Sequence, residues 1–230
     1  MHKDGTLIML DKELSPVSEA YRKLRTNLQF INQCNSVKSL LFSSSLAGEG
    51  KSVTVANIAV TLAQAGKKVV VADCDLRKPV QHLLFGRRAT GLTNVIRGER
   101  TLAEVLQDTE VPNLRLLASG ARPPNPAELL ASEKMTKLLR ELTDSADYVI
   151  IDSPPILPVT DTCILANQVD GVVVVLGAGI VRVEAAQLAM EALESVRANV
   201  VGVMINREEI SREQAYYYSY HNSKSSRVRG

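Results

Sequence analysis

The chain has 230 residues, of which 45% are hydrophobic and 23% charged; this exceeds a typical single domain, yet α/β folds of this length are often one unit. Its formal net charge of +2 does not favour nucleic acid as a partner, because nucleic-acid-binding domains carry a strongly basic face. Its three cysteines lack metal-ligand spacing, so no zinc site is predicted.

The first predicted element is a helix over about residues 15–31. Ser15 followed by Pro16 is a typical N-cap and first helical residue. Apolar residues then recur at helical spacing, and one face of the helix is expected to be buried. The residues of this face are Val17, Ala20, Tyr21, Leu24, Leu28 and Ile31.

The same helix carries a charged flank. Glu19, Arg22 and Arg25 recur every three residues, which makes them neighbours on one side of the helix. Such groups pair within the helix, pair across to another protein, or remain solvated, and the spacing alone leaves these alternatives open.

A loop suited to phosphate follows an apolar run at residues 37–42, and a helical pattern at 53–65 comes after it. Gly48 and Gly50 let backbone N–H groups turn toward an anion, the helix adds its positive dipole end, and Lys51 adds a charge. We therefore predict a nucleoside triphosphate site. Its residues are Gly48, Glu49, Gly50, Lys51, Ser52 and Val53.

The loop fits the template G-x-x-x-x-G-K-[ST] only in part. Ser45 stands where the template has its first glycine. A tight strand-to-helix turn with a solvated Lys51 is therefore an alternative, and residues further along the chain bear on the choice.

Two later strands end in aspartate. Residues 69–72 are followed by Asp73 and Asp75, and residues 148–151 are followed by Asp152. The carboxyl ends of parallel strands lie at one edge of a sheet, so these carboxylates are expected to meet the phosphate loop. Ser52, Asp75 and Asp152 suit the oxygen preference of Mg²⁺.

Residues 73 and 75 of an extended segment point to the same side, so one carboxylate can reach the metal while the other faces the incoming nucleophile. Asp73 is the candidate catalytic base. We assign catalytic roles to Asp73, Lys51 and Asp75. The alternative for each aspartate is a helix cap or a turn residue after a strand.

Further apolar runs at residues 114–118, 172–176 and 200–205 alternate with helical patterns at 133–142 and 182–196. This alternation predicts an α/β fold with a doubly wound, mostly parallel sheet whose strands are buried on both faces. We expect one domain over residues 1–210 and a mobile tail over residues 211–230.

The tail holds most of the tyrosines of the chain. Tyr216, Tyr217, Tyr218 and Tyr220 lie in a polar setting that offers nothing apolar to bury them. Without further information they belong to a disordered tail with no chemical role, or stack on nucleic-acid bases, or serve as reactive hydroxyl groups.

Residues 47–52, 71–77 and 150–155, read together, resemble the bacterial tyrosine kinases of capsule and exopolysaccharide biosynthesis. The likeness spans nearly the whole chain. It implies a P-loop NTPase fold related to the partitioning-type ATPases, and a protein-tyrosine kinase that uses ATP and Mg²⁺ to move the γ-phosphoryl group to a tyrosine hydroxyl.

The resemblance also assigns roles to residues. It implies that Tyr216, Tyr217, Tyr218 and Tyr220 are autophosphorylated, that Asn206 holds adenine, and that Glu19, Arg22 and Arg25 lie at the subunit interface of a ring. Residues 211–218 span at most about 26 to 29 Å when extended, a reach that suits the active site of a neighbouring subunit. Transfer between subunits is therefore expected.

Partners follow from the same resemblance. A transmembrane adaptor, a cognate tyrosine phosphatase and protein-tyrosine substrates are implied, and no nucleic acid. The longest apolar stretch, residues 171–181, is too short to span a bilayer, and no signal sequence opens the chain. We expect a cytoplasmic protein that the adaptor recruits to the inner face of the membrane, as in members whose kinase is a separate chain.

Two other functions compete with the kinase. One is a partitioning-type ATPase switch that positions water with the same aspartates. Its deviant loop carries an extra lysine where this chain has Leu46, which weakens that reading. The other is a nucleotide-gated scaffold with little chemistry of its own.

Overall fold

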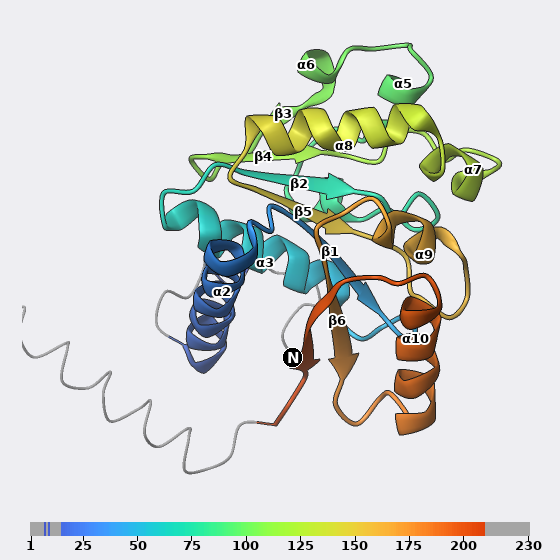
Figure 1. Cartoon of the computed structure of the whole chain (residues 1–230). Helices are drawn as coiled ribbons and strands as arrows, with labels where there is room; N and C mark the ends of the chain where they lie inside the picture. Colours follow the sequence, from blue (N-terminus) through green and yellow to red (C-terminus); the bar gives the residue numbers. More distant parts are fainter. Residues whose placement is uncertain (1–6, 8, 10–14, 210–230) are drawn as a thin grey trace, which may run out of the picture.

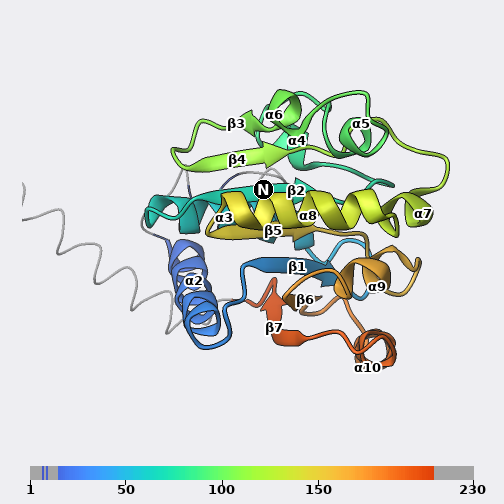
Figure 2. The same cartoon turned by 45° about the horizontal axis from the view of Figure 1, so that its top comes forward.

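The computed structural model describes residues 7, 9 and 15–209 of the chain, and Figure 1 shows its arrangement. A seven-stranded sheet in the order β3-β4-β2-β5-β1-β6-β7 forms the centre. All neighbouring strands are parallel except β3 and β4, which pair antiparallel at one edge. Figure 2 shows this order from β4 through β6. The strands are β1 Ser39–Ser44, β2 Val69–Asp73, β3 Gln107–Asp108, β4 Leu114–Leu117, β5 Tyr148–Asp152, β6 Gly171–Gly177 and β7 Val200–Asn206.

Helices cover both faces of the sheet, as the predicted doubly wound fold requires. In Figure 1, α8 lies on one face, and α2 and α3 lie on the other. The long helices are α2 Pro16–Asn35, α3 Lys51–Gln64, α8 Glu133–Ser145 and α10 Val183–Ser195. The short ones are α4 Gln81–Leu84, α5 Leu92–Ile96, α6 Leu102–Val105, α7 Pro126–Leu130 and α9 Asp161–Ala166.

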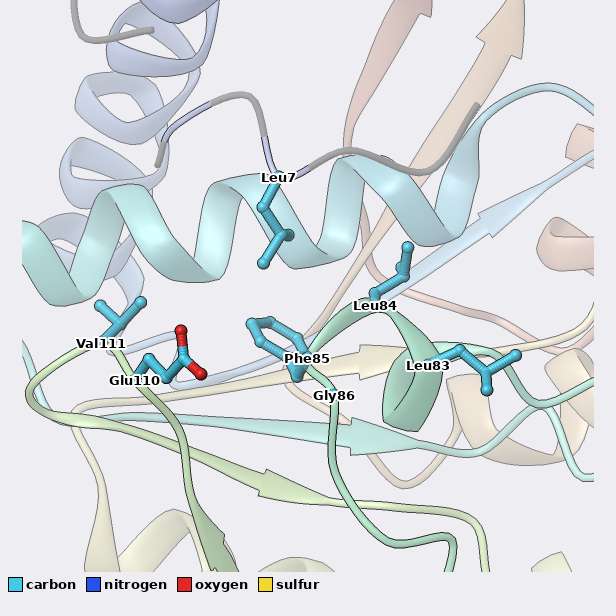
Figure 3. Close-up of a pocket in the computed structure, with 7 residues that line it drawn as sticks. All are labelled: Leu7, Leu83, Leu84, Phe85, Gly86, Glu110 and Val111. Atoms are coloured by element: carbon cyan, nitrogen blue, oxygen red, sulfur yellow. The ribbon is translucent and has the colours of Figure 1, made fainter. Parts of the chain in front are cut away.

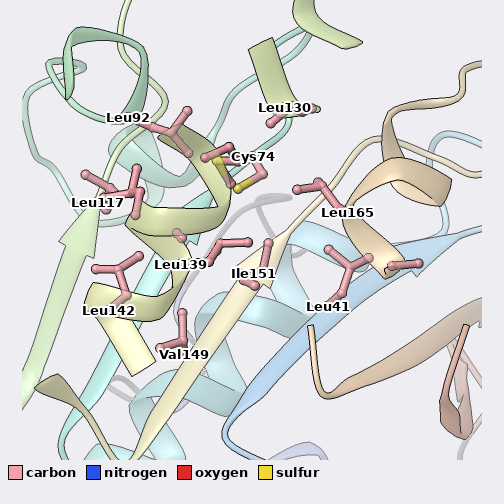
Figure 4. Packing of buried hydrophobic residues seen from close by; sticks show 14 of the residues in the cluster. Leu41, Cys74, Leu92, Leu117, Leu130, Leu139, Leu142, Val149, Ile151 and Leu165 are labelled. Atoms are coloured by element: carbon pink, nitrogen blue, oxygen red, sulfur yellow. The ribbon is translucent and has the colours of Figure 1, made fainter. Parts of the chain in front are cut away.

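Two apolar clusters, one on each face, hold the sheet between its helices. Val149 and Ile151 of β5 pack with Leu139 and Leu142 of α8 on one side, as Figure 4 shows. On the other side, buried residues of α3 pack with the alternate positions of the same strands, such as Ile150. Strands β1, β2, β5 and β6 are buried because their apolar residues alternate between these two clusters. The prediction of burial on both faces was wrong for the edge strand β7, which exposes Val203 and Ile205.

Helix α2 begins as predicted. Ser15 caps it by accepting a hydrogen bond from the N–H of Ser18 at 3.0 Å, and Pro16 follows at the first helical position. The predicted buried face was wrong at Val17 and Ala20, which are exposed, whereas Ser18 is buried. The buried stripe follows the 3.6-residue period of the helix through Ser18, Tyr21 and Leu28, and the prediction was right at the last two of these.

The other predicted elements are confirmed with shifted bounds, and five short helices and the edge strand β3 were not predicted. The phosphoacceptor candidates Tyr216, Tyr217, Tyr218 and Tyr220, like the rest of the predicted tail at 211–230, lie outside the described residues. Among the helices that the structure describes, none combines the length and the apolar character needed to cross a bilayer.

Candidate active site

The predicted phosphate loop lies between β1 and α3 at the carboxyl edge of the sheet. Gly48 and Gly50 have φ angles of 91° and 89°, in the region that favours glycine. At Gly50 a side chain is excluded for a second reason, because a Cβ would collide with the amide of Asn206. The loop therefore needs glycine at this position to bring its backbone to the start of α3.

Glu49 holds the loop in place. Its carboxylate is buried and accepts hydrogen bonds from the N–H of Leu46 at 2.7 Å and from the N–H of Gly177 at 2.8 Å. Its carbonyl accepts a hydrogen bond from the side-chain amide of Asn206 at 2.9 Å. The Glu49 side chain is thus a brace between the loop and the end of β6, and only its backbone remains for a nucleotide.

Asn206 was predicted to hold adenine. In this structure its side-chain amide donates to the loop through Glu49, which ties the last strand to the phosphate loop. The contact puts Asn206 at the edge of the expected nucleotide site, and its role toward the base stays a prediction.

Lys51, Ser52 and Asp152 meet at the centre of the site. The Lys51 ammonium donates to Asp152 Oδ1 and, at 3.1 Å, to Ser52 Oγ. The Lys51–Asp152 pair is buried, so its attraction is little screened by water. The positive charge at the first turn of α3 therefore lies between two of the three predicted metal ligands.

Asp73 and Asp152 are direct partners in the register of β2 and β5, and the N–H of Cys74 donates to the Asp152 carbonyl at 2.8 Å. Asp73 Oδ2 accepts hydrogen bonds from the backbone N–H groups of Val80 at 3.1 Å and Gln81 at 2.9 Å. Asp73 therefore also caps the start of α4. The alternative of a capping role for this aspartate coexists with its place in the site.

Burial raises the pKa of Asp73 to about 8, and the nearby charge of Asp152 acts in the same direction. Burial also raises the pKa of the Cys74 thiol well above its usual value, with the charges of Asp73, Asp152 and Asp75 adding to the effect. Cys74 is consequently a protonated core group.

Asp75 lies two residues beyond the end of β2. Its Oδ1 accepts hydrogen bonds from the N–H of Arg77 at 3.3 Å and the N–H of Lys78 at 2.9 Å. This is the turn role that the sequence left open. The turn fixes the carboxylate, which is buried at the same edge of the sheet as Asp152.

The sequence reasoning missed two residues of the site. Gln81, at the start of α4, donates through Nε2 to Asp152 Oδ2 at 2.7 Å and to the Ser52 carbonyl at 3.0 Å. Asp161, at the start of α9, accepts two hydrogen bonds from the Arg77 guanidinium, both at 2.9 Å. Those hydrogen bonds raise the pKa of Arg77. No local pattern marks either contact, because the partners lie far apart along the chain.

The donor set suits Mg²⁺ better than a metal held by protein alone. Among the described residues no group of three His, Cys, Asp or Glu side chains is placed to hold a metal ion. Mg²⁺ usually takes one or two carboxylates, keeps several waters and binds substrate phosphates. The Lys51 ammonium lies between Ser52 Oγ and Asp152 Oδ1, so these two oxygens already hold a positive charge at the place where Mg²⁺ is expected.

A separate hollow of about 340 Å³ lies between Leu7, α4 and the loop after β3, as Figure 3 shows. Its described lining is apolar at Leu84, Phe85 and Val111 and has one ionisable residue, Glu110. None of the predicted site residues within the described ranges lines it. Because this described lining offers no nucleophile and no phosphate-binding group, we place the active site at the loop and not in this hollow.

The charged flank of α2, formed by Glu19, Arg22 and Arg25, contains an ion pair within the helix. Arg22 pairs with Glu19 within the helix at 3.2 Å, and the pair is partly exposed. Arg25 Nε is buried and has no hydrogen-bond partner among the described residues. The pairing within the helix is one of the alternatives that the sequence left open, and the subunit interface stays a prediction.

The raised pKa of Asp73 predicts how the stability of the nucleotide-free protein depends on pH. Between pH 3.8 and about pH 8, the Asp73 carboxyl is protonated in the native state and ionised in the unfolded state. The stability that this protonation gives the native state is complete below pH 3.8 and is lost as pH rises through this range. In EDTA we expect the free energy of unfolding to fall by up to about 1.4 kcal/mol per pH unit. Urea unfolding at several pH values measures it. Asp73→Asn should flatten the decline, and equal slopes for the two proteins would contradict the assignment.

Comparison with known proteins gives one consistent result. A family model described as an AAA domain matches residues 37–207. Tyrosine-protein kinase YwqD of Bacillus subtilis (strain 168) is 41% identical over 213 residues, covering 92% of this chain and 90% of that protein. The kinase domain of the Escherichia coli tyrosine kinase ETK has a similar structure, with a TM-score of 0.83, 29% identity, and coverage of 92% of this chain and 86% of that chain.

A more distant likeness concerns the fold alone. The septum site-determining protein MinD from Pyrococcus horikoshii, complexed with Mg-ADP, has a TM-score of 0.64 and 22% identity over 79% of this chain and 76% of that chain. The predicted α/β P-loop NTPase fold is thereby confirmed.

Proposed function

This chain belongs to the bacterial tyrosine kinases of capsule and exopolysaccharide biosynthesis, which makes it a nucleotide-binding protein-tyrosine kinase, and we propose that its substrate is its own tail. In this proposal the chain phosphorylates the tyrosines of that tail from Mg-ATP. The observation that carries the proposal is the meeting of Lys51, Ser52, Asp73 and Asp152 at the phosphate loop. The phosphoacceptors are Tyr216, Tyr217, Tyr218 and Tyr220.

The reaction breaks the bond between the γ-phosphorus of ATP and its bridging oxygen, and forms a bond from that phosphorus to the tyrosine oxygen. ADP leaves, and the hydroxyl proton passes to a base. Such transfer depends mainly on positioning and on neutralising charge. The N–H groups of residues 48–53 and the Lys51 ammonium hold the β and γ phosphates.

Ser52, Asp75 and Asp152 would hold Mg²⁺, which when bound neutralises charge on the phosphates. Asp73 accepts the hydroxyl proton. Its raised pKa would leave it mostly protonated at neutral pH in the nucleotide-free site. A bound Mg²⁺ would lower that pKa, because a positive charge favours the ionised form of a nearby carboxyl.

The assembled protein is proposed to be a ring with Glu19, Arg22 and Arg25 at its interfaces and transfer between subunits. A membrane adaptor would recruit it to the inner face of the membrane. The other proposed partners are protein-tyrosine substrates and a cognate tyrosine phosphatase. The proposed role is control of polysaccharide synthesis and export.

Replacing Tyr216, Tyr217, Tyr218 and Tyr220 by Phe tests the acceptor assignment. We expect phosphotyrosine on the chain to be lost almost completely, while the affinity for ATP, measured by equilibrium binding, stays unchanged because these residues take no part in the phosphate loop. Intact and peptide mass spectrometry after incubation with Mg-ATP measures the phosphate.

Two outcomes would count against the proposal. Phosphate at full level elsewhere on the chain would refute the assigned acceptors. Continued ATP turnover with no phosphotyrosine in the unaltered protein, including with the adaptor's cytoplasmic segment present, would favour the ATPase switch.

A further inference from the structure

Gln81 forms hydrogen bonds with three residues of the proposed active site, Asp73, Asp152 and Ser52. It is fully buried at the first position of α4. Its backbone N–H donates to Asp73 Oδ2 at 2.9 Å. Its side-chain Nε2 donates to Asp152 Oδ2 at 2.7 Å and to the Ser52 carbonyl at 3.0 Å.

The surroundings fix which way the Gln81 amide points. A carboxylate oxygen and a backbone carbonyl accept hydrogen bonds and cannot donate them, so the nitrogen must face Asp152 and Ser52. Both protons of the amide are then used. Oε1 is buried and has no hydrogen-bond partner among the described residues.

A buried acceptor without a donor is uncommon in folded proteins, because the group has lost its water and gained nothing in exchange. The side chain of Gln81 is fully buried and lies beside the oxygens that the proposed function gives to Mg²⁺. The waters that Mg²⁺ retains are hydrogen-bond donors of the kind that Oε1 lacks.

We propose that Gln81 is a positioning residue for Mg²⁺ binding: Nε2 holds Asp152 Oδ2 so that Oδ1 is presented to a cation, and Oε1 accepts a hydrogen bond from a metal-bound water. This inference rests on the proposed Mg-nucleotide site. It adds a residue that touches neither nucleotide nor metal directly and acts through Asp152 and through water.

Within the part of the chain that the structure describes, the Asp152 carboxylate has two hydrogen-bond partners, Lys51 and Gln81, and only Gln81 can stay in place when ATP binds. Its Oδ1 is now bound by the Lys51 ammonium, which the proposed function assigns to the phosphates of ATP. When Lys51 turns to the phosphates, Oδ1 is released while Oδ2 remains on Gln81. The backbone bond from Gln81 to Asp73 keeps the start of α4 at the site throughout.

Gln81→Met removes both functional atoms of the amide and keeps the length of the side chain. The probe is ADP carrying a fluorescent ribose label. Two quantities are measured: its affinity in EDTA, and the Mg²⁺ concentration that half-saturates the fluorescence change at fixed nucleotide. We expect the half-saturating Mg²⁺ concentration to rise about 10-fold or more, because loss of outer-shell partners weakens metal binding to that degree.

The affinity in EDTA should stay within about twofold of wild type, because among the described residues Gln81 forms no hydrogen bond with Lys51 or with a glycine of the loop. Gln168→Met is the matched control. Gln168 also donates through Nε2 to two acceptors, the carbonyls of Leu130 in α7 at 2.9 Å and Ile164 in α9 at 3.3 Å, and neither is a proposed metal ligand. Gln168→Met should leave the Mg²⁺ response unchanged.

Gln81→Ala, which leaves room for water in place of the amide, repeats the measurement if Gln81→Met does not fold. An unchanged Mg²⁺ requirement in a folded Gln81 variant would overturn this inference and leave the kinase proposal intact. An equal loss of affinity with and without Mg²⁺ would also overturn it, because it would show a purely structural role. Nucleotide binding that ignores Mg²⁺ in the wild-type protein would refute the proposed metal site itself.

Discussion

Lys51→Met is expected to lower the rate of tyrosine phosphorylation by at least about 10² to 10³-fold, the effect of removing one group that stabilises charge in a transition state. It should also destabilise the nucleotide-free protein by about 3 kcal/mol. The second effect follows from the buried Lys51–Asp152 pair, because the substitution leaves the Asp152 carboxylate buried without its cation.

The two effects are separated by a double variant. In Lys51→Met with Asp152→Asn, the unpaired charge is gone, and Gln81 Nε2 still finds an oxygen on the asparagine. We expect urea unfolding to return most of the lost stability, while activity stays absent. A single variant as stable as wild type would contradict the pairing, and recovery of activity in the double variant would contradict the catalytic role of Lys51.

The inactive double variant also serves as an acceptor for testing transfer between subunits. It keeps its tail tyrosines and is mixed with a Lys51-containing chain whose Tyr216, Tyr217, Tyr218 and Tyr220 are Phe. Phosphate on the inactive chain is the expected result, read by mass spectrometry. Absence of phosphate there, with an active partner shown by another substrate, would mean that transfer runs within one chain.

Arg77→Met is the second substitution with a large expected effect. The Arg77 guanidinium makes two hydrogen bonds of 2.9 Å to Asp161, whose side chain is fully buried while that of Arg77 is 41% exposed. Removal of the arginine leaves a buried carboxylate unpaired, and we expect a loss of about 3 kcal/mol in the free energy of unfolding.

The consequence reaches the active site, because Arg77 joins the segment after Asp75 to the start of α9, beyond Asp152. Kinase activity should therefore fall as well, although Arg77 lies outside the phosphate loop. Arg100→Met is a matched control: Arg100 pairs with Glu104 at 3.3 Å with both side chains exposed, and such pairs contribute about 0 to 1 kcal/mol. Equal losses for the two arginines, measured by urea unfolding, would contradict this account.

Much of the fold was predictable because its signals are local and repeated. Buried parallel strands are continuous runs of Val and Ile, and the runs at 69–72, 148–151 and 172–176 became β2, β5 and β6 with small shifts. Long helices showed their period. Helices of four to six residues, such as α4 and α9, are too short for a period of 3.6 residues to appear.

The residues of the candidate site also separate into those that the sequence could predict and those that it could not. Lys51, Asp73 and Asp152 could be brought together from the sequence, because each follows a strand and all parallel strands deliver their ends to one edge. Gln81 and Asp161 could not, because they reach partners 71 and 84 residues away through side-chain contacts that no spacing records. Glu49 was assigned to the nucleotide, but its side chain is used by the scaffold.

The hydrogen bonds of Glu49 connect the phosphate loop to the end of the sheet from which the chain leads toward its tail. Through Gly177 and Asn206 they tie the phosphate loop to the ends of β6 and β7, and residues 207–209 leave the sheet from there. Coupling between binding sites is reciprocal: if a protein bound at this exit tightens the hold on ATP by some factor, ATP tightens the hold on that protein by the same factor. Nucleotide supply would then set how long such a complex lasts.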